Sequence, residues 1–269
     1  MIDLHCHILP GLDDGSERLE ESIEMARAAE EDGIEKIVAT PHLFRDNLDY
    51  EDLSIIEEKK DELNQALRTN NIKVEILAGA EVNISHHLLE QIRENRSYLT
   101  LHQSSYMFVE FPPDHVFSGV KELFFELMSE GITPIIAHPE RNSVFIHHPG
   151  SLYELLQMGA LAQANSGSFL GSYGSTVESA VLRLLQLNMI QFIGSDGHNS
   201  RSKAPRLSEA VKIAASLIGE ERAKALVKEN PQAVLDDQQI PDFPEPIHPE
   251  EKERKLRIKL PSFLGRDKK

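Results

Sequence analysis

The chain of 269 residues contains a single cysteine, Cys6, so it can form no internal disulfide and no cysteine-based zinc site. It also lacks any run of about eighteen apolar residues, the length that a membrane-spanning helix needs. Histidines and carboxylates occupy the positions that the apolar region of a signal peptide would require: His5, His7, Asp13 and Asp14. We therefore expect a soluble, cytoplasmic protein.

Positive charge is scarce over most of the chain. Lys and Arg number 28 against 44 Asp and Glu, for a net charge of −16. Nucleic acid binding needs clustered Lys and Arg against the phosphates, so this balance argues against a nucleic acid partner. The exception is residues 252–269, where eight Lys or Arg face two acids, which leaves −22 on residues 1–251.

Glycine-rich phosphate loops such as GxGxxG or GxxxxGK[ST] are also absent, whereas short apolar runs alternate with helix-period segments throughout. Seven runs are typical of buried strands: residues 1–4, 34–40, 73–80, 106–111, 133–137, 161–165 and 189–195. This alternation predicts parallel strands joined by helices, and without a phosphate loop it favours a β/α barrel of about seven strands over an open nucleotide-binding sheet.

Two of the helical segments carry boundary signals. In residues 16–33 we expect Ser16 to cap the helix and Gly33 to end it. In residues 205–229 we expect Asn230-Pro231 to end the helix.

The pattern ends after Leu235, and the sequence that follows is rich in proline and charge. We expect one α/β catalytic domain over residues 1–236 and a Pro-rich linker with a basic tail over residues 237–269. Such a tail is usually a solvated end. A sharper hypothesis is peripheral, electrostatic contact with an anionic membrane or an acidic partner.

Six of the seven predicted strands end in, or just before, a histidine or a carboxylate. These eight residues are His5, His7, His42, Glu81, Glu110, His138, Asp196 and His198. In a β/α barrel the C-terminal strand ends meet on one rim, where active sites lie. One such residue is usually a structural hydrogen-bonding group or a helix cap, but eight on six strand ends indicate a functional cluster.

Carboxylates gathered on such a rim would repel one another unless protons or cations neutralised them. Imidazole and carboxylate without thiolate suit Zn, Mn, Fe or Co rather than Cu(I). The residues are too many for one tetrahedral ion. They predict two or three metal ions sharing a bridging carboxylate, an arrangement suited to phosphoryl displacement or hydrolysis.

The same motifs resemble the polymerase-and-histidinol-phosphatase (PHP) superfamily: HxH in the first strand, Asp14, TPH, two glutamates, HPER and SDGH. Over about residues 1–236 the likeness is to the metal-dependent tyrosine-protein phosphatases of bacterial capsular and exopolysaccharide operons. The resemblance implies a distorted (β/α)7 barrel with three divalent ions, Mn first and Fe, Zn or Co as alternatives. It also implies a phosphotyrosine protein as substrate, such as a membrane-associated bacterial tyrosine kinase.

The resemblance further implies how the ligands are divided among the ions. They are His5, His7, Asp196 and the bridging Glu81 for one ion, Glu81, Glu110 and His138 for a second, and Asp14, His42 and His198 for the third. Asp13 could replace its neighbour Asp14 in principle.

Arg141 of HPER is the candidate phosphate clamp, because its planar fork matches two phosphate oxygens. The alternative is a salt bridge with Glu140. Where the family pattern has a second arginine this chain has Lys203, with Arg201 two residues earlier, and the sequence does not choose between them. A phenolate leaves comparatively well, and we assign no general acid.

Two further polar groups and the single cysteine complete the candidates. Asn165 and Ser166, after the sixth strand, are expected to support the ligands from behind. A cysteine-dependent phosphatase needs Cys-x5-Arg, but Leu12 stands at the arginine position after Cys6. Strand periodicity also turns Cys6 away from His5 and His7, so we expect a buried, inert thiol.

Three other functions share parts of this pattern. A small-molecule phosphatase of the histidinol-phosphate type would use the same ligands behind a differently shaped mouth. A PHP nuclease is disfavoured by the charge of −22 on residues 1–251. A metal-stabilised scaffold without catalysis is disfavoured because no ligand position is lost.

Overall fold

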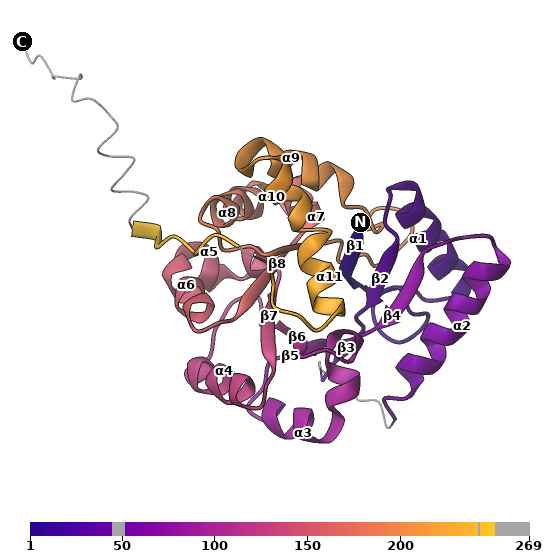
Figure 1. Ribbon diagram of the computed structural model, residues 1–269, viewed down its shortest axis with the longest axis horizontal. Coiled ribbons are helices and arrows are strands. Elements are labelled where there is room, and N and C mark those ends of the chain that lie inside the picture. Colours follow the sequence, from indigo (N-terminus) through magenta and orange to yellow (C-terminus); the bar gives the residue numbers. More distant parts are fainter. Residues whose placement is uncertain (45–51, 242, 251–269) are drawn as a thin grey trace, which may run out of the picture.

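The computed structural model describes residues 1–44, 52–241 and 243–250 (Figure 1). The strands are β1 Ile2–Cys6, β2 Lys36–Ala39, β3 His42–Leu43, β4 Glu75–Ala78, β5 Glu81–Asn83, β6 Tyr106–Glu110, β7 Thr133–Ala137, β8 Leu161–Asn165 and β9 Phe192–Gly194. The α-helices are α1 Leu19–Glu31, α2 Ile55–Thr69, α3 Leu88–Leu99, α4 Val120–Ser129, α5 Ser143–His147, α6 Pro149–Gln157, α7 Ser166–Phe169, α8 Ser175–Gln186, α9 Ser208–Ile218, α10 Glu220–Ala225 and α11 Glu229–Leu235. Two 3-10 helices, η1 Leu101–Gln103 and η2 Pro139–Arg141, lie between them.

All the strand pairs are parallel and form two sheets, in the order β1-β2-β4 and β3-β5-β6-β7-β8-β9. The second and third predicted strands correspond to β2 and β4, and each is followed, just beyond the predicted run, by a short strand that was not predicted, β3 after β2 and β5 after β4. Gly79 lies at the break between β4 and β5, where a side chain would not fit, because a Cβ there would lie 2.8 Å from a methyl carbon of Val38. The predicted α/β class with parallel strands is confirmed.

The first and last strands meet at a seam beside the predicted ligands. Cys6 and Gly197 form a parallel bridge, and the backbone nitrogen of Asp196 donates to the His5 carbonyl at 2.9 Å. The Asp3 carboxylate reinforces the seam by accepting from the backbone nitrogens of Ser195 (3.0 Å) and His5 (3.2 Å). Residues from the two ends of the barrel sequence are thereby brought together.

The core has two parts. The strands of the two sheets together surround a central space, called the ring below. A smaller cluster of buried residues draws members from both sheets, including Leu4, Val38, Phe108 and Phe192, and therefore fills the interior of this ring. A larger cluster lies between the strands and the surrounding helices. Helix α11 lies against β1, and Val234 from this helix joins the interior cluster, so the helix closes the end of the ring opposite the ligands.

Two of the expected helix boundaries are wrong. Helix α1 begins at Leu19 with Arg18 as its N-cap residue, while the Ser16 hydroxyl donates to the Arg18 carbonyl instead of capping the helix. Asn230-Pro231 lies in the first turn of α11 rather than ending a helix. Proline is tolerated there because backbone nitrogens in a first turn have no partner inside the helix.

The described part of the expected linker lies against the barrel. The Asp237 carboxylate accepts from the backbone nitrogen and hydroxyl of Ser105, and the Tyr106 hydroxyl donates to the Gln238 carbonyl at 2.7 Å. Farther on, the backbone nitrogen of Ile247 donates to the Leu187 carbonyl. The division after residue 236 stays a prediction, and the basic residues of the tail lie outside the described residues.

In the described part of the chain, none of the helices has the length and apolar character needed to cross a bilayer.

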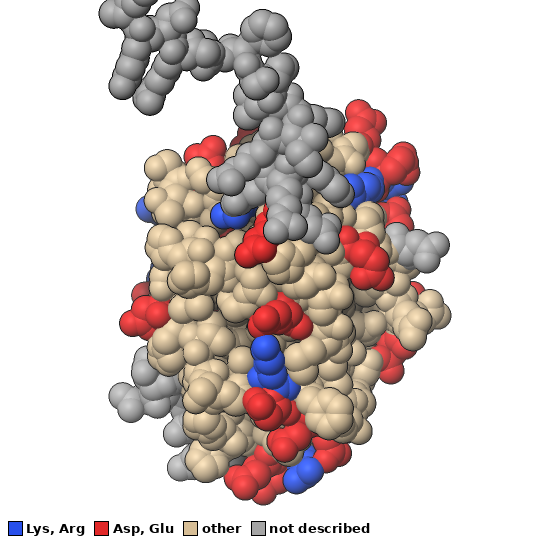
Figure 2. All heavy atoms as spheres, turned by 90° about the vertical axis from the view of Figure 1, so that its left-hand side faces the viewer, with Lys and Arg blue, Asp and Glu red and all other residues tan. Residues whose placement is uncertain are grey.

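Figure 2 shows the face formed on the left of Figure 1, where red acidic side chains are spread among blue basic ones.

Candidate metal centre

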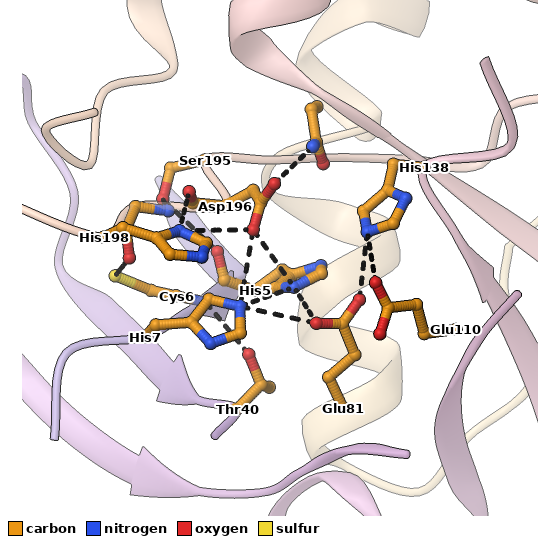
Figure 3. A network of polar contacts seen from close by, with 12 residues as sticks. His5, Cys6, His7, Thr40, Glu81, Glu110, His138, Ser195, Asp196 and His198 are labelled. Carbon is orange, nitrogen blue, oxygen red and sulfur yellow. Dashed lines mark hydrogen bonds and ion pairs between the residues drawn. The ribbon is translucent and has the colours of Figure 1, made fainter. Parts of the chain in front are cut away.

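The structure brings all nine predicted ligands to one side of the ring, and Figure 3 shows seven of them. Seven elements or loops supply them: β1 (His5 and the following His7), the loop before α1 (Asp14), β3 (His42), β5 (Glu81), β6 (Glu110), and the segments after β7 (His138) and β9 (Asp196, His198).

Glu81 lies at the middle of the cluster and is fully buried. Its Oε2 is 3.2 Å from His5 Nε2 and 3.0 Å from His42 Nδ1, and its Oε1 is 3.1 Å from His138 Nε2. Among the described residues, neither oxygen has a partner in hydrogen-bond geometry. A buried carboxylate faced by several imidazole nitrogens without hydrogen bonds is the arrangement expected of donors that share cations.

The donor atoms fall into three overlapping groups. Each residue of a group contributes one donor atom, and all the donor atoms of that group lie within 4.8 Å of one another. The groups are His5, His7 and Glu81; His42, Glu81 and Glu110; and His7, Asp14, His42 and His198. Asp196 Oδ1 adjoins the first group, 3.3 Å from His7 Nε2, and His138 adjoins the second through Glu81.

His42 takes part in two of these groups. Its Nε2 lies 3.5 Å from Asp14 Oδ1, and its Nδ1 lies 3.5 Å from Glu110 Oε2. The groups therefore share His7 and His42 as well as Glu81, and the implied division of ligands among three ions stays a prediction.

Partners behind the imidazoles fix which nitrogen faces the centre. His7 Nδ1 is 2.6 Å from Asp13 Oδ2, and His198 Nδ1 donates to the Asp196 backbone carbonyl at 2.8 Å. Each ring then presents Nε2 to the cluster, as metal-ligating histidines do. Asp13 also accepts from the backbone nitrogens of Gly15 and His42.

This geometry distinguishes the two neighbouring aspartates. Asp14 Oδ1 lies among the donors, 3.4 Å from His198 Nε2, whereas Asp13 stands behind His7. The supporting role of Asp13 was missed in the sequence, where the pair differs in no visible way. Gly15 allows the turn, because a Cβ there would lie 2.2 Å from the His7 carbonyl oxygen.

The backbone is strained at two of the predicted ligands. His138 and Asp196 have φ values of +32° and +51°, in the left-handed region that residues with a Cβ rarely adopt. Such strain persists where surrounding structure enforces it and is common at functional sites.

The electrostatics of the cluster favour positive charge among the imidazoles. Burial lowers the pKa of His5, but the adjacent Glu81 and Asp196 carboxylates outweigh burial and raise the pKa of His5 to about 9. Despite burial, the imidazoles hold the pKa of Glu81 and Asp196 below their usual range. Protons or divalent cations can supply this positive charge, and cation binding releases the protons.

Arg141 reaches the cluster from η2. Its Nη1 donates to Asp196 Oδ2 at 2.8 Å, and its guanidinium carbon is 4.7 Å from the centre of the Tyr173 ring. With Glu110 and His138 it lines a cavity of about 160 Å³. Glu140 turns the other way: its buried carboxylate accepts from the Asn165 backbone nitrogen and the Ser168 hydroxyl.

Arg201 and Lys203 lie on an exposed loop, and Arg201 lines a surface groove with Glu24 and Arg206 beside α1. The loop is held by Asn199, whose side-chain oxygen accepts from both backbone nitrogens. A role for either side chain as a second phosphate clamp stays a prediction.

Cys6 is buried and points away from the cluster, with its thiol donating to the Gly197 carbonyl. Burial raises the pKa of the Cys6 thiol well above its usual value. A thiolate nucleophile is therefore unfavourable at this position.

A family model described as "Capsular polysaccharide synthesis, CpsB/CapC" matches residues 1–236. The tyrosine-protein phosphatase YwqE of Bacillus subtilis is 39% identical over 256 residues, covering 95% of this chain and 98% of YwqE. The putative tyrosine-protein phosphatase CapC of Staphylococcus aureus is 34% identical over 202 residues, covering 74% of this chain and 77% of CapC.

This chain also resembles solved structures. A chain from the crystal structures of Bacillus subtilis YwqE and Streptococcus pneumoniae CpsB, described as unique metal-dependent tyrosine phosphatases, superposes with a TM-score of 0.87. It is 38% identical, and the match covers 92% of this chain and 99% of that one. A histidinol phosphate phosphatase from Lactococcus lactis, with a TM-score of 0.52 and 16% identity over 83% of this chain and 94% of that one, shares the fold alone.

Proposed function

The chain belongs to the CpsB/CapC family of capsular polysaccharide synthesis, and on this basis we propose that it is a metal-dependent protein-tyrosine phosphatase. The observation that carries the proposal is the complete cluster of histidines and carboxylates around Glu81, in a chain so similar to YwqE. A non-catalytic scaffold would not need to keep each of these donors in place.

The donor set fits divalent cations. Imidazole and carboxylate donors surround a buried glutamate that has no hydrogen-bond partner among the described residues. We propose three ions, with Mn first among Mn, Fe, Zn and Co, held as the family resemblance implies. When bound, such ions would lower the pKa of water toward neutrality and offset the charge of a phosphoryl group.

The protein supplies binding and orientation. Arg141 uses Nη1 to hold Asp196, which leaves its other N–H groups for phosphoryl oxygens in the adjoining cavity. The ring of Tyr173 packs on the same guanidinium and limits its movement. Asp13 and the Asp196 carbonyl hold His7 and His198 in the orientation that presents Nε2 to the cluster.

The proposed partner is a phosphotyrosine protein of capsule or exopolysaccharide synthesis, such as a membrane-associated tyrosine kinase, with the enzyme in the cytoplasm. The family's role in capsular polysaccharide synthesis supports this, as does the surplus of Lys and Arg in residues 252–269. Deleting residues 251–269 should reduce binding to anionic liposomes and turnover of a liposome-bound phosphotyrosine peptide. Unchanged values for both would refute a membrane role for the tail.

The function is tested by assaying the Mn-loaded protein side by side on a phosphotyrosine peptide, histidinol phosphate and single-stranded DNA. We expect preference for the peptide, with activity lost in His138→Ala because this residue contacts Glu81 in the cluster. Preference for histidinol phosphate or DNA would overturn the proposal in favour of the corresponding alternative.

A further inference from the structure

Strand β8 supplies none of the nine ligands, yet two of its side chains point at them. Gln163 and Asn165 are two residues apart and therefore share one face of the strand. Both are fully buried. Buried amides need partners for each donor and acceptor, so their contacts carry information about the groups they touch.

The two amides link His5 to Asp196 through three hydrogen bonds. His5 Nδ1 is 2.7 Å from Gln163 Oε1, Gln163 Nε2 is 3.0 Å from Asn165 Oδ1, and Asn165 Nδ2 is 2.6 Å from Asp196 Oδ2. The Asn165 backbone is fixed in turn, because its nitrogen donates to the buried Glu140 carboxylate at 2.9 Å.

The charge of Asp196 sets the direction of this chain of hydrogen bonds. An ionised carboxylate can only accept, so Asn165 must turn its NH₂ group toward Asp196 and its oxygen toward Gln163. Gln163 must then donate to Asn165 and turn its own oxygen toward His5. The remaining contact is satisfied only if His5 carries its hydrogen on Nδ1.

The consequence appears on the other side of the imidazole ring. With the hydrogen on Nδ1, the lone pair of His5 lies on Nε2, which is 3.2 Å from Glu81 Oε2 and 3.6 Å from Asp196 Oδ1. This is the nitrogen that faces the cluster. His7 and His198 obtain the same orientation from local groups, an aspartate and a backbone carbonyl.

We propose that Gln163 is a positioning residue that, through Asn165, couples the tautomer of His5 to the carboxylate of Asp196. A single chain of hydrogen bonds thereby orients two ligands from opposite ends of the barrel sequence. Losing the Gln163 oxygen removes the partner that keeps the hydrogen on Nδ1, so cation binding at His5 and His7 weakens.

Three variants test this proposal. Gln163→Met keeps the approximate length of the side chain but removes both the acceptor for His5 Nδ1 and the donor to Asn165, whereas Gln163→Glu keeps the acceptor and loses only the donor. The matched control is Gln191→Met, because Gln191 is also buried beside β8 but accepts from the Ala162 backbone nitrogen, away from the ligands. Zn²⁺ affinity is measured by competition with a chelator, together with the thermal midpoint of the metal-free protein.

We expect Gln163→Met to weaken the tightest Zn²⁺ binding by about 10–100-fold, as loss of a group behind a ligand commonly does. Gln163→Glu should weaken Zn²⁺ binding less than Gln163→Met does, because it keeps the acceptor for His5 Nδ1 although it loses the donor to Asn165. Gln191→Met should lower the thermal midpoint without changing Zn²⁺ affinity. Unchanged affinity in Gln163→Met, or an equal loss in Gln163→Met and Gln163→Glu, would overturn the proposal.

A second measurement needs no variant. In the Zn-loaded wild type, ¹⁵N NMR of the histidine side chains should show the His5 hydrogen on Nδ1, and a hydrogen on Nε2 would contradict the proposal. Neither measurement uses turnover, so the result is independent of whether the substrate is a phosphotyrosine protein.

Discussion

Asp196 illustrates how much a single side chain does in this molecule. One oxygen faces His5 and His7, while the other accepts from both Arg141 and Asn165. The carboxylate therefore connects the predicted metal ligands to the proposed phosphate clamp, while Asn165 holds the same oxygen independently of Arg141.

Replacing Arg141 with alanine should lower turnover on a phosphotyrosine peptide at least tenfold, about 1.4 kcal/mol in the barrier, because the fork for phosphoryl oxygens is lost. Metal content should remain intact, since Asn165 still holds Asp196. Steady-state kinetics and elemental analysis of the same samples check both parts. Wild-type kinetics in this variant would remove Arg141 from the site.

The buried carboxyl group of Asp3 should make the stability of the fold depend on pH. Burial raises its pKa to about 6, despite hydrogen bonds from Ser195 and His5. The unfolded value is about 3.9, so between pH 4 and 6 the folded state binds more protons than the unfolded state. The contribution of Asp3 to stability is therefore greatest in acid and declines as pH rises through this window.

Asp3→Asn should remove that dependence. Relative to the wild type, the variant should gain stability between pH 4 and pH 7 by on the order of 2 kcal/mol, since each pKa unit corresponds to about 1.4 kcal/mol. Urea unfolding of the metal-free proteins at both pH values measures the difference. If the free energy of unfolding differed between the two proteins by the same amount at both pH values, Asp3 would have the same pKa in the folded and the unfolded state.

At this scale the sequence identified which residues meet in the cluster, because histidines and acids at strand ends are conspicuous, while their role as metal ligands stays a prediction. Asp13 and Gln163 were not found. One is an aspartate beside another aspartate, and the other is a strand amide, so neither carries a signal until its partner is located in space.

At the scale of elements, the seven strands were predictable because each is a short apolar run, and the observed strands lie within the predicted runs or a few residues from them. The interruptions between β2 and β3 and between β4 and β5 were not predictable. At one of them, Gly79 lies close to Val38 and Leu101, which are distant in sequence. Asn230-Pro231 was expected to end a helix but lies in the first turn of α11. A proline near a helix boundary therefore does not reveal whether the helix lies before it or after it.

Gly194 in β9 lets this strand approach the ligands. A Cβ at this position would lie 2.9 Å from His5 Cβ and 3.0 Å from Gln163 Cδ, so Gly194→Ala must displace one of them. We expect Zn²⁺ affinity to fall at least tenfold in this variant, comparable to loss of a supporting group. Gly150→Ala in α6, where a Cβ meets nothing within 4 Å, is the matched control and should bind as the wild type does. Equal affinities in the two variants would contradict the expected strain.

At the scale of the whole molecule, the α/β class followed from the alternation of strands and helices, and the rim followed from the way parallel strands align. The arrangement into two sheets did not, because it depends on tertiary contacts at the seams. The Cys6–Gly197 bridge at one seam joins segments that nothing in the sequence pairs.

Metal removal should destabilise the entire fold, because the ligands lie on both sides of the seam between β1 and β9. A cation present at 100 times its dissociation constant adds about 2.7 kcal/mol to the free energy of unfolding. Calorimetry with Mn and then with excess chelator should show the thermal midpoint fall, and the fall should be smaller in His138→Ala. A midpoint indifferent to chelator would argue against cations in the cluster.

The seam between β1 and β9 also has a consequence for biosynthesis. The ribosome makes His5 and His7 early but Asp196 and His198 only after most of the barrel, roughly 10–40 s later at ordinary elongation rates. Until then the nascent chain lacks Asp196, which adjoins the first group, and Gly197, which bridges to Cys6 at the end of β1. The cluster can therefore be assembled only near the end of translation, and the metal that fills it is selected from the cellular pool that the nearly finished barrel meets.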